Sequence, residues 1–325
     1  MKIFFYYMRP FDELAMAEQI SRELDIPFGW AAEYPTLENA ELAAGYDIVS
    51  APPCDMNGKL VERFHELGVR CIACHSIGFD HVDLETARRL GMRVTNVTYP
   101  PEGVADYAIM LMLMCLRRMP YILKCTEVQD YALKGKIGRE LSGCTVGVIG
   151  TGNIGATVIR HLSGFGCRVL AYDIRPRDDL PAAYVSLKEL LAQADVITLH
   201  APVNDANAHM IGREAIAGMK RGAVIVNTAR GRLIDTEALI EGLVSGQIGA
   251  AALDVLEQEG GLYYKDRRYD VIADRQMAML RAMPNVIVSP HTAFYTETDV
   301  YHMVLGNFQT AVCLRDGTED PHVIL

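Results

Sequence analysis

Short apolar runs alternate with amphipathic stretches along almost the whole chain. The runs are rich in the β-branched and small apolar residues typical of strands, whereas the stretches between them place apolar residues at helical spacing. This repeated alternation predicts an α/β fold, in which helices cover both faces of parallel sheets. The first series is predicted to have strands at residues 2–7, 48–51, 70–74 and 93–97, and helices at residues 12–24 and 83–90.

A second series of strands is richer in Val, Ile and Leu, as expected where a strand is buried on both faces. One long helix at residues 103–119 is predicted to separate the two series. A last helix at residues 296–314 is expected to fold back onto the first domain, so that the chain crosses between the domains twice. The second series is predicted at residues 145–149, 168–172, 196–200, 223–227, 250–253 and 286–289.

Length and charge narrow the class of protein. The 325 residues exceed what one hydrophobic core usually organises, so two domains are expected. A net charge of -10 disfavours binding to nucleic acid or to an anionic membrane, and an anionic substrate would need a local positive group. Residues 1–13 are typical of a strand rather than a signal peptide, and the most apolar stretch, residues 108–116, is too short to span a bilayer. We therefore expect a cytoplasmic protein.

The eight cysteines are expected to be free thiols in that compartment. Cys71, Cys74 and His75 match the C-x-x-C-H pattern of covalent haem attachment. Their surroundings, VRCIAC, are instead typical of a buried strand in which cysteine packs as a small apolar residue. A zinc site would need a second pair of ligands at suitable spacing, which the sequence lacks, so no metal is predicted.

A glycine motif marks a candidate cofactor site. Gly150, Gly152 and Gly155 form G-x-G-x-x-G directly after the strand TVGVI and at the start of a predicted helix, which is the context that a dinucleotide site requires. The first glycine permits a tight turn, the second lets the backbone approach the diphosphate, and the third lets helix and strand pack closely. The diphosphate would lie at the helix N-terminus, where free N–H groups point outward.

Asp173 ends the strand RVLAYD, where an acidic residue would hydrogen-bond the ribose of NAD. Its carboxylate would repel the 2′-phosphate of NADP. Arg175 and Arg177 follow closely and weaken that argument. NAD is nevertheless the predicted cofactor.

Arg230, Glu259 and His291 each lie at or just beyond the end of a predicted strand in the second series. Ligands of open parallel sheets bind outside the carboxyl ends of the strands, so we expect the three side chains to converge. Arginine can donate hydrogen bonds to both the carboxylate and the carbonyl of a 2-oxo acid. A histidine can donate a proton to the alkoxide that hydride transfer creates. A carboxylate can orient the histidine ring and stabilise its charged form. Glu257, two residues earlier, competes with Glu259 for the last role, and the motif register favours Glu259. Arg9, after the first strand, is compatible with either an active-site or a surface position.

The segments SIGFDHVD, NVTYPPEGVADYA, GVIGTGNIG, NTARGRLIDT, AALDVLEQE and SPHTAFYT together resemble the D-isomer-specific 2-hydroxyacid dehydrogenase family. The resemblance is strongest to its D-lactate dehydrogenase branch, including the enzymes of vancomycin-resistance operons. It covers nearly the whole chain. It implies a flavodoxin-like substrate domain at residues 1–101 and 296–325, a Rossmann NAD-binding domain at residues 102–295, and a homodimer.

The resemblance also implies roles for particular residues. Arg230, Glu259 and His291 would be catalytic, the backbone of Ile77 and Gly78 would hold the substrate carboxylate, and the chain would reduce pyruvate to D-lactate with NADH. The chain departs from the operon enzymes at Asp173, which supports NAD, and Phe79 replaces a smaller or polar residue. Further implied residues are Tyr99, Phe294 and Tyr295 near the substrate, and Asn153, Ile154, Ala201, Pro202, Asn207, Thr228 and Asp254 around the cofactor.

Two alternatives stay open at this point. The substrate could be a bulkier branched or aromatic 2-oxo acid, because one methylene changes discrimination by only about 1–3 kcal/mol and loop geometry cannot be deduced from sequence. Formate is disfavoured because that branch replaces the catalytic carboxylate with Gln, and a phosphorylated acid is disfavoured because no basic cluster is evident. A non-catalytic protein that senses NAD is the alternative from another class, against which the retained Arg, Glu and His argue.

Overall fold

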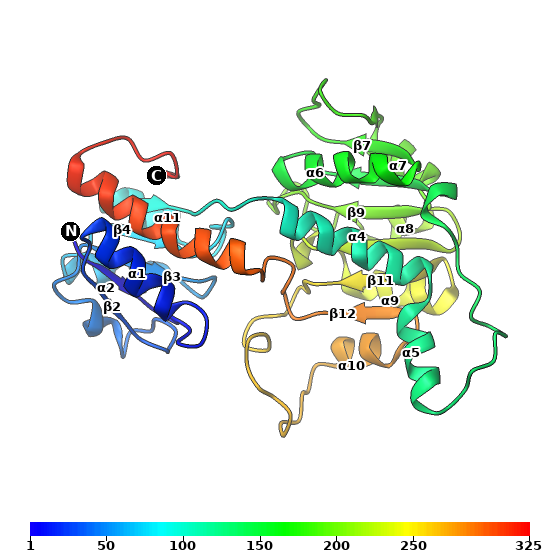
Figure 1. The fold of residues 1–325 in the computed structure, drawn as a ribbon, viewed down its shortest axis with the longest axis horizontal. Helices are drawn as coiled ribbons and strands as arrows, with labels where there is room; N and C mark the ends of the chain where they lie inside the picture. The colour runs from blue at the N-terminus through cyan, green and yellow to red at the C-terminus, as the bar shows by residue number, and fades with distance from the viewer. The chain divides into compact units, whose positions relative to one another are not determined.

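The computed structural model describes residues 1–325, which divide into two compact units (Figure 1). Unit 1 contains Met1–Pro100 and Tyr295–Leu325, and unit 2 contains Pro101–Phe294.

Unit 1 is a five-stranded parallel sheet in the order β2-β1-β3-β4-β5, the flavodoxin-like order. Helices α1 and α11 pack side by side on one face, where Ile20 and Phe308 contribute to a shared core (Figure 1). The last helix therefore folds back onto the first domain, as predicted. Helices α2 and α3 cover the other face. The elements are β1 Ile3–Phe5, α1 Leu14–Leu24, β2 Phe28–Trp30, β3 Ile48–Ala51, α2 Gly58–Glu66, β4 Cys71–Cys74, α3 Leu84–Arg89, β5 Arg93–Thr95 and α11 Glu297–Asp316.

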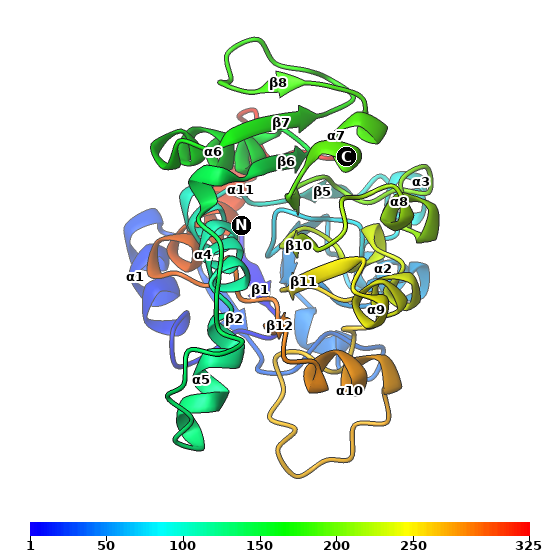
Figure 2. The same cartoon turned by 90° about the vertical axis from the view of Figure 1, so that its right-hand side faces the viewer.

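Unit 2 is a seven-stranded parallel sheet in the order β12-β11-β10-β9-β6-β7-β8. Helices α4 and α6 cover one face, and α7, α8 and α9 cover the other (Figure 2). Strand β6 lies between β9 and β7. Strands β7 and β8 follow it toward one edge of the sheet, and β9 to β12 follow toward the other edge, so the order of strand addition reverses at β6. The elements are α4 Glu102–Leu116, α5 Met119–Glu127, β6 Thr145–Ile149, α6 Asn153–Leu162, β7 Arg168–Tyr172, β8 Ala183–Tyr184, α7 Leu187–Gln193, β9 Val196–Leu199, α8 Arg213–Ala217, β10 Ala223–Asn227, α9 Thr236–Ser245, β11 Ile248–Leu253, α10 Arg275–Ala282 and β12 Val286–Val288.

Side-chain caps define where several helices begin. Asn57, Asp83, Asp235 and Thr296 each accept a hydrogen bond from a backbone N–H in the first turn of the following helix. Ser186 forms a complete capping box at the start of α7. Such caps satisfy N–H groups that have no partner within the helix.

The predicted long helix at residues 103–119 is wrong in extent. Helix α4 ends at Leu116, Arg118 adopts a left-handed conformation with φ of 54°, and α5 begins at Met119. Pro120 explains the break, because proline lacks the N–H that a continuous helix would need and its ring clashes with the preceding turn.

The C-x-x-C segment is a buried strand, as its composition predicted. Cys71 and Cys74 lie in β4, all four residues of which are buried. All eight cysteines are free. None of the helices combines the length and apolar character needed to cross a membrane.

Candidate active site

The glycine motif forms the turn between β6 and α6. Gly150 has φ of +89°, and a Cβ there would lie 2.7 Å from the backbone of His200 and Ala201. A Cβ on Gly155 would lie 2.0 Å from the carbonyl oxygen of Gly150. Only glycine permits this close approach of β6, β9 and α6. At Gly152, in contrast, a Cβ would meet no atom within 4 Å, so the turn is open there.

The surroundings of this turn fit a dinucleotide. Helix α6 begins at Asn153 and Ile154 without a side-chain cap, so its first N–H groups are available to a diphosphate. The hydroxyl of Thr228 is buried without a hydrogen-bond partner in the protein. A buried polar atom of this kind needs a ligand or water to satisfy it.

Residues 201–207, directly after β9, form a loop that is closed by its own side chains. Asn207 Nδ2 donates to the carbonyl of Pro202 at 2.8 Å, and its Oδ1 accepts from the backbone N–H of Asn204. Ala201 lies against the glycine turn at Gly150. The loop is thus held at the same edge of the sheet as the glycine motif.

Asp173 follows β7 and accepts three hydrogen bonds. Thr151 donates its backbone N–H at 2.6 Å and its hydroxyl at 3.1 Å to Oδ2, and the N–H of Arg175 donates to Oδ1 at 2.8 Å. Burial alone would raise the pKa of the Asp173 carboxyl, but these hydrogen bonds outweigh burial and hold its pKa below its ordinary value. Asp173 is therefore a charged group beside the glycine turn. Arg177, which weakened the argument for NAD, is paired with Asp179.

His291 and Glu259 form a direct pair. Nδ1 of His291 lies 2.9 Å from Oε1 of Glu259, and Oε2 of Glu259 accepts from the N–H of Leu256 at 3.0 Å. Both side chains are partly exposed. The carboxylate leaves Nε2 on the opposite edge of the ring, where a ligand could accept its proton.

Asp254 fixes the loop that carries His291. Its carboxylate is fully buried and accepts from the hydroxyl of Ser289 at 2.6 Å and from the N–H groups of Thr292 and Ala293 at 2.9 Å each. The N–H of His291 donates to the carbonyl of Asp254 at 2.8 Å. His291 has φ of 54°, a strained conformation for a non-glycine residue that such contacts can maintain.

Arg230 follows β10 and lies on a loop packed against the segment that leads to Glu259. A Cβ on the next residue, Gly231, would lie 2.0 Å from the backbone carbon of Leu256, so the two loops touch without intervening side chains. Asn227 holds the loop by donating to the carbonyl of Arg230 at 2.9 Å. The guanidinium of Arg230 donates to the carbonyl of Ala229 at 2.8 Å.

Glu257 occupies a different environment from Glu259. It accepts from the hydroxyl of Thr236 at 2.9 Å and lies 2.5 Å from Nε2 of His209. The geometry therefore selects Glu259 rather than Glu257 as the partner of His291, in agreement with the motif register.

The remaining predicted residues belong to unit 1, apart from Phe294, whose ring is edge-on to His291 at 6.3 Å between centroids. Ile77 and Gly78 lie in the loop after β4, where Asn96 donates to the carbonyl of Ile77 at 2.8 Å and Ser76 donates to that of Gly78 at 2.6 Å. Tyr99, in the segment after β5, is half-buried, and the hydroxyl of Tyr295 donates to Asp12.

Sequence reasoning missed Tyr264. Its hydroxyl donates to the carbonyl oxygen of His291 at 3.0 Å, and the two rings lie 6.2 Å apart. The only signal was the tyrosine pair at residues 263–264, shortly after Glu259 in the sequence, which does not reveal a contact with a residue so much later in the chain.

Comparison with known families gives a match over most of unit 2. Residues 109–293 match the family described as D-isomer-specific 2-hydroxyacid dehydrogenase, NAD binding domain. The matched range contains the glycine turn, Asp173 and the Arg230, Glu259 and His291 segments.

Comparison with individual proteins extends the similarity to the whole chain. The chain is 41% identical over 309 residues to the aromatic 2-oxoacid reductase of Clostridium sporogenes, covering 94% of this chain and 93% of that protein. It is 38% identical over 323 residues to the D-lactate dehydrogenase of Lactobacillus delbrueckii subsp. bulgaricus, covering 98% and 97%. The solved structure of a D-2-hydroxyisocaproate dehydrogenase superimposes with a TM-score of 0.89 at 34% identity, covering 100% of this chain and 99% of that one.

Proposed function

This chain belongs to the family of D-isomer-specific 2-hydroxyacid dehydrogenases, and from that premise we propose that it is a D-lactate dehydrogenase that reduces pyruvate to D-lactate. It is an oxidoreductase, and NAD(H) is the cofactor of its family. The observation that carries the catalytic part of the proposal is the 2.9 Å contact between His291 and Glu259.

The cofactor is proposed to lie at the turn of Gly150, Gly152 and Gly155, with its diphosphate at the N-terminus of α6. Asp173 would accept hydrogen bonds from the ribose, and the unpaired hydroxyl of Thr228 would point toward the cofactor. When bound, NADH supplies the hydride, and the protein supplies position and charge. Further contacts are assigned to Asn153, Ile154, Ala201, Pro202, Asn207 and Asp254.

Arg230 is proposed to bind the 2-oxo acid. Its planar guanidinium can donate two parallel hydrogen bonds to the carboxylate and carbonyl oxygens. In a protein with a net charge of -10, such a local cation is needed to attract an anionic substrate. The backbone N–H groups at Ile77 and Gly78 are assigned to the same carboxylate, and Tyr99, Phe294 and Tyr295 to the substrate surroundings.

His291 is proposed to donate the proton. Glu259 accepts from Nδ1, which fixes the ring and leaves the proton on Nε2 for the substrate oxygen. The negative charge of Glu259 stabilises the imidazolium that must be present before donation, and in the reverse reaction His291 acts as the base.

A bulkier substrate is the second candidate. Similarity to an aromatic 2-oxoacid reductase at 41% identity over 94% of this chain favours it directly. The same Arg230, Glu259 and His291 would act in either case, because only the side chain of the 2-oxo acid differs.

The exposed apolar residues of the segment that begins in α5 support a homodimer. Leu123, Val128, Tyr131, Leu133 and Ile137 are all at least half exposed. Exposed apolar side chains concentrated in one segment of the chain favour a protein interface there. We propose a homodimer in the cytoplasm, where the eight free cysteines would stay reduced. Light scattering of the wild type and of a Leu133→Asp/Ile137→Asp variant tests the dimer, which the variant should weaken.

The function is tested by following NADH oxidation with pyruvate, 2-oxoisocaproate and phenylpyruvate, with NADPH as the cofactor control and chiral chromatography of the product. Highest kcat/KM with pyruvate and a D product supports D-lactate dehydrogenase. Highest kcat/KM with phenylpyruvate supports the second candidate. Binding of NADH without turnover of any 2-oxo acid would overturn both and favour an NAD sensor.

A further inference from the structure

Unit 1 contains a buried carboxylate that has no part in the proposed chemistry. Glu13, just before α1, is 1% exposed. Its Oε1 lies 2.6 Å from Nη2 of Arg9 and 2.9 Å from Nε2 of His75, and its Oε2 accepts from the N–H of Arg9 at 2.8 Å. Burial alone would raise the pKa of Glu13, but its electrostatic interaction and hydrogen bond with His75, together with its contacts with Arg9, outweigh burial and hold the pKa below its ordinary value. Glu13 is therefore ionised.

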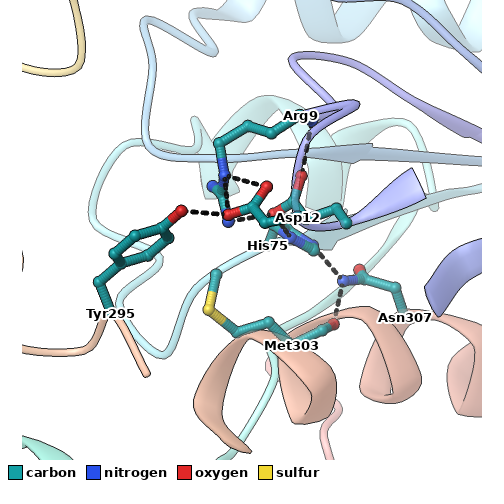
Figure 3. Close-up of polar contacts among 7 residues, drawn as sticks. Arg9, Asp12, His75, Tyr295, Met303 and Asn307 are labelled. Atoms are coloured by element: carbon teal, nitrogen blue, oxygen red, sulfur yellow. Dashed lines mark hydrogen bonds and ion pairs between the residues drawn. The ribbon is translucent and has the colours of Figure 1, made fainter. Parts of the chain in front are cut away.

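Asn307 of α11 determines the proton position on His75 (Figure 3). The amide Nδ2 of Asn307 lies 2.8 Å from the carbonyl of Met303 and 2.8 Å from Nδ1 of His75. A carbonyl can only accept, so the Met303 contact identifies this atom as the NH₂ group. Nδ1 of His75 is then the acceptor, and Nε2 of His75 donates to Glu13.

Arg9 extends the cluster to Tyr295 (Figure 3). Its Nε donates to both oxygens of Asp12 at 3.0 Å, and its guanidinium lies 5.4 Å from the centre of the Tyr295 ring. The hydroxyl of Tyr295 donates to Asp12. Because two carboxylates surround the one guanidinium of Arg9, the cluster has no net positive charge to offer an anionic substrate, which favours a supporting position for Arg9 over a substrate-binding one.

The cluster joins two segments that the proposed function assigns to the substrate. His75 directly precedes the loop that contains Ile77 and Gly78. Tyr295 is the first residue of unit 1 after the chain returns from unit 2. Both segments are thus held by contacts that converge on Glu13, directly through His75 and through Arg9.

Stability alone does not account for a polar cluster at this position. His75 is flanked by the ring of Phe5, which belongs to the apolar core between the sheet and α11. The Oδ1 of Asn307 is buried without a partner. Well-packed apolar residues of similar volume are often at least as stabilising as a buried ionic group, whereas the hydrogen bonds of a polar group fix direction.

We propose that Glu13 is a positioning residue for the 2-oxo acid: through His75 and Arg9 it fixes the Ile77–Gly78 backbone and Tyr295 in the orientation that binds the substrate. The inference rests on the proposed function and deepens it. Glu13 itself touches neither substrate nor cofactor, so its loss should weaken substrate binding and leave cofactor binding intact.

The test is Glu13→Gln, with Glu66→Gln as the matched control in an exposed ion pair of the same unit. We expect Glu13→Gln to raise the KM of the 2-oxo acid on the order of tenfold, because small displacements of positioning groups are costly. The kcat should stay within about threefold and the fluorescence-measured Kd of NADH within about twofold, since the lost contacts affect substrate binding. Glu66→Gln should match the wild type.

Asn307→Leu is the second variant, and it tests the same proposal if Glu13→Gln does not fold. It removes the donor to Nδ1 of His75 with little change in size, and we expect KM to rise in the same direction. If both residues act through His75, the double variant should raise KM by less than the product of the two single effects.

An unchanged KM in folded variants would overturn the inference while leaving the dehydrogenase function intact. Parallel losses in kcat, in NADH affinity and in melting temperature would also overturn it, because they indicate a structural role only. A wild type that turns over no 2-oxo acid would instead reject the proposed function, and the inference with it.

Discussion

The imidazole of His291 and the carboxylate of Glu259 lie 2.9 Å apart although 32 residues separate them in the chain. Glu259 follows β11 and His291 follows β12, and these strands are neighbours in the parallel sheet. Adjacent parallel strands place their carboxyl ends at one edge, so the loops after them meet. The pair is therefore a product of the sheet order.

His291→Ala should reduce kcat by about 10²- to 10⁴-fold, the usual contribution of a general acid. The Kd of NADH, measured by fluorescence, should be unchanged. His302→Ala is the control, because His302 is half-buried on α11 and its Nδ1 contacts the backbone carbonyl of Thr298. Equal kcat in the two variants would contradict the role of His291.

Glu259→Gln should lower kcat on the order of tenfold or more, because an amide cannot stabilise the imidazolium as a carboxylate does. Glu257→Gln is the matched comparison, two residues away. It should weaken the contacts to His209 and Thr236 but affect kcat less. Steady-state kinetics of both variants provides the measurement, and a larger kcat defect in Glu257→Gln would reverse the assignment.

Asp173→Asn should shift cofactor preference toward NADPH, with the ratio of kcat/KM values for NADPH and NADH rising about tenfold, because a carboxylate near the ribose repels a 2′-phosphate. Asp316→Asn, an exposed residue at the end of α11, is the control. An unchanged ratio in Asp173→Asn would show that the carboxylate does not face the ribose.

The same substitution predicts a pH effect on stability. The pKa of Asp173 is lowered in the folded protein, so the charged form stabilises the fold above the ordinary aspartate pKa, and that contribution is lost as pH falls through the lowered value. Asp173→Asn should therefore lose less stability than the wild type between neutral and acid pH. Urea unfolding across that range checks the sign, and an identical pH dependence would contradict it.

Gly155→Ala should weaken NADH binding and destabilise the protein by about 1–3 kcal/mol, the usual cost of inserting a methyl group into a packed region. Its Cβ would lie 2.0 Å from the carbonyl oxygen of Gly150 and push α6 away from the turn. Gly164→Ala, where a Cβ meets no atom within 4 Å, is the matched control. NADH titration and thermal unfolding of both variants should separate them.

The local sequence pattern was sufficient to predict the bounds of a strand where that strand is a continuous apolar run. The predicted bounds of β6, β7 and β10 coincide with the structure, because strands buried on both faces are uninterrupted runs of apolar residues. Strands β2 and β8 were missed. Both are short edge strands with at most partial burial, so their sequences lack that signal.

By itself, the sequence determined those features of the site that depend on residues within one short segment. The glycine turn followed by a helix, the acid at the end of the next strand and the family motifs all depend on residues close together in the chain. The motif register favoured Glu259, and the tertiary structure places it beside His291. Only the tertiary structure decided that Asp254 holds the His291 loop and that Glu13, His75 and Asn307 form one cluster. These contacts join residues far apart in sequence, and they depend on strand order and helix packing, which local propensity does not specify.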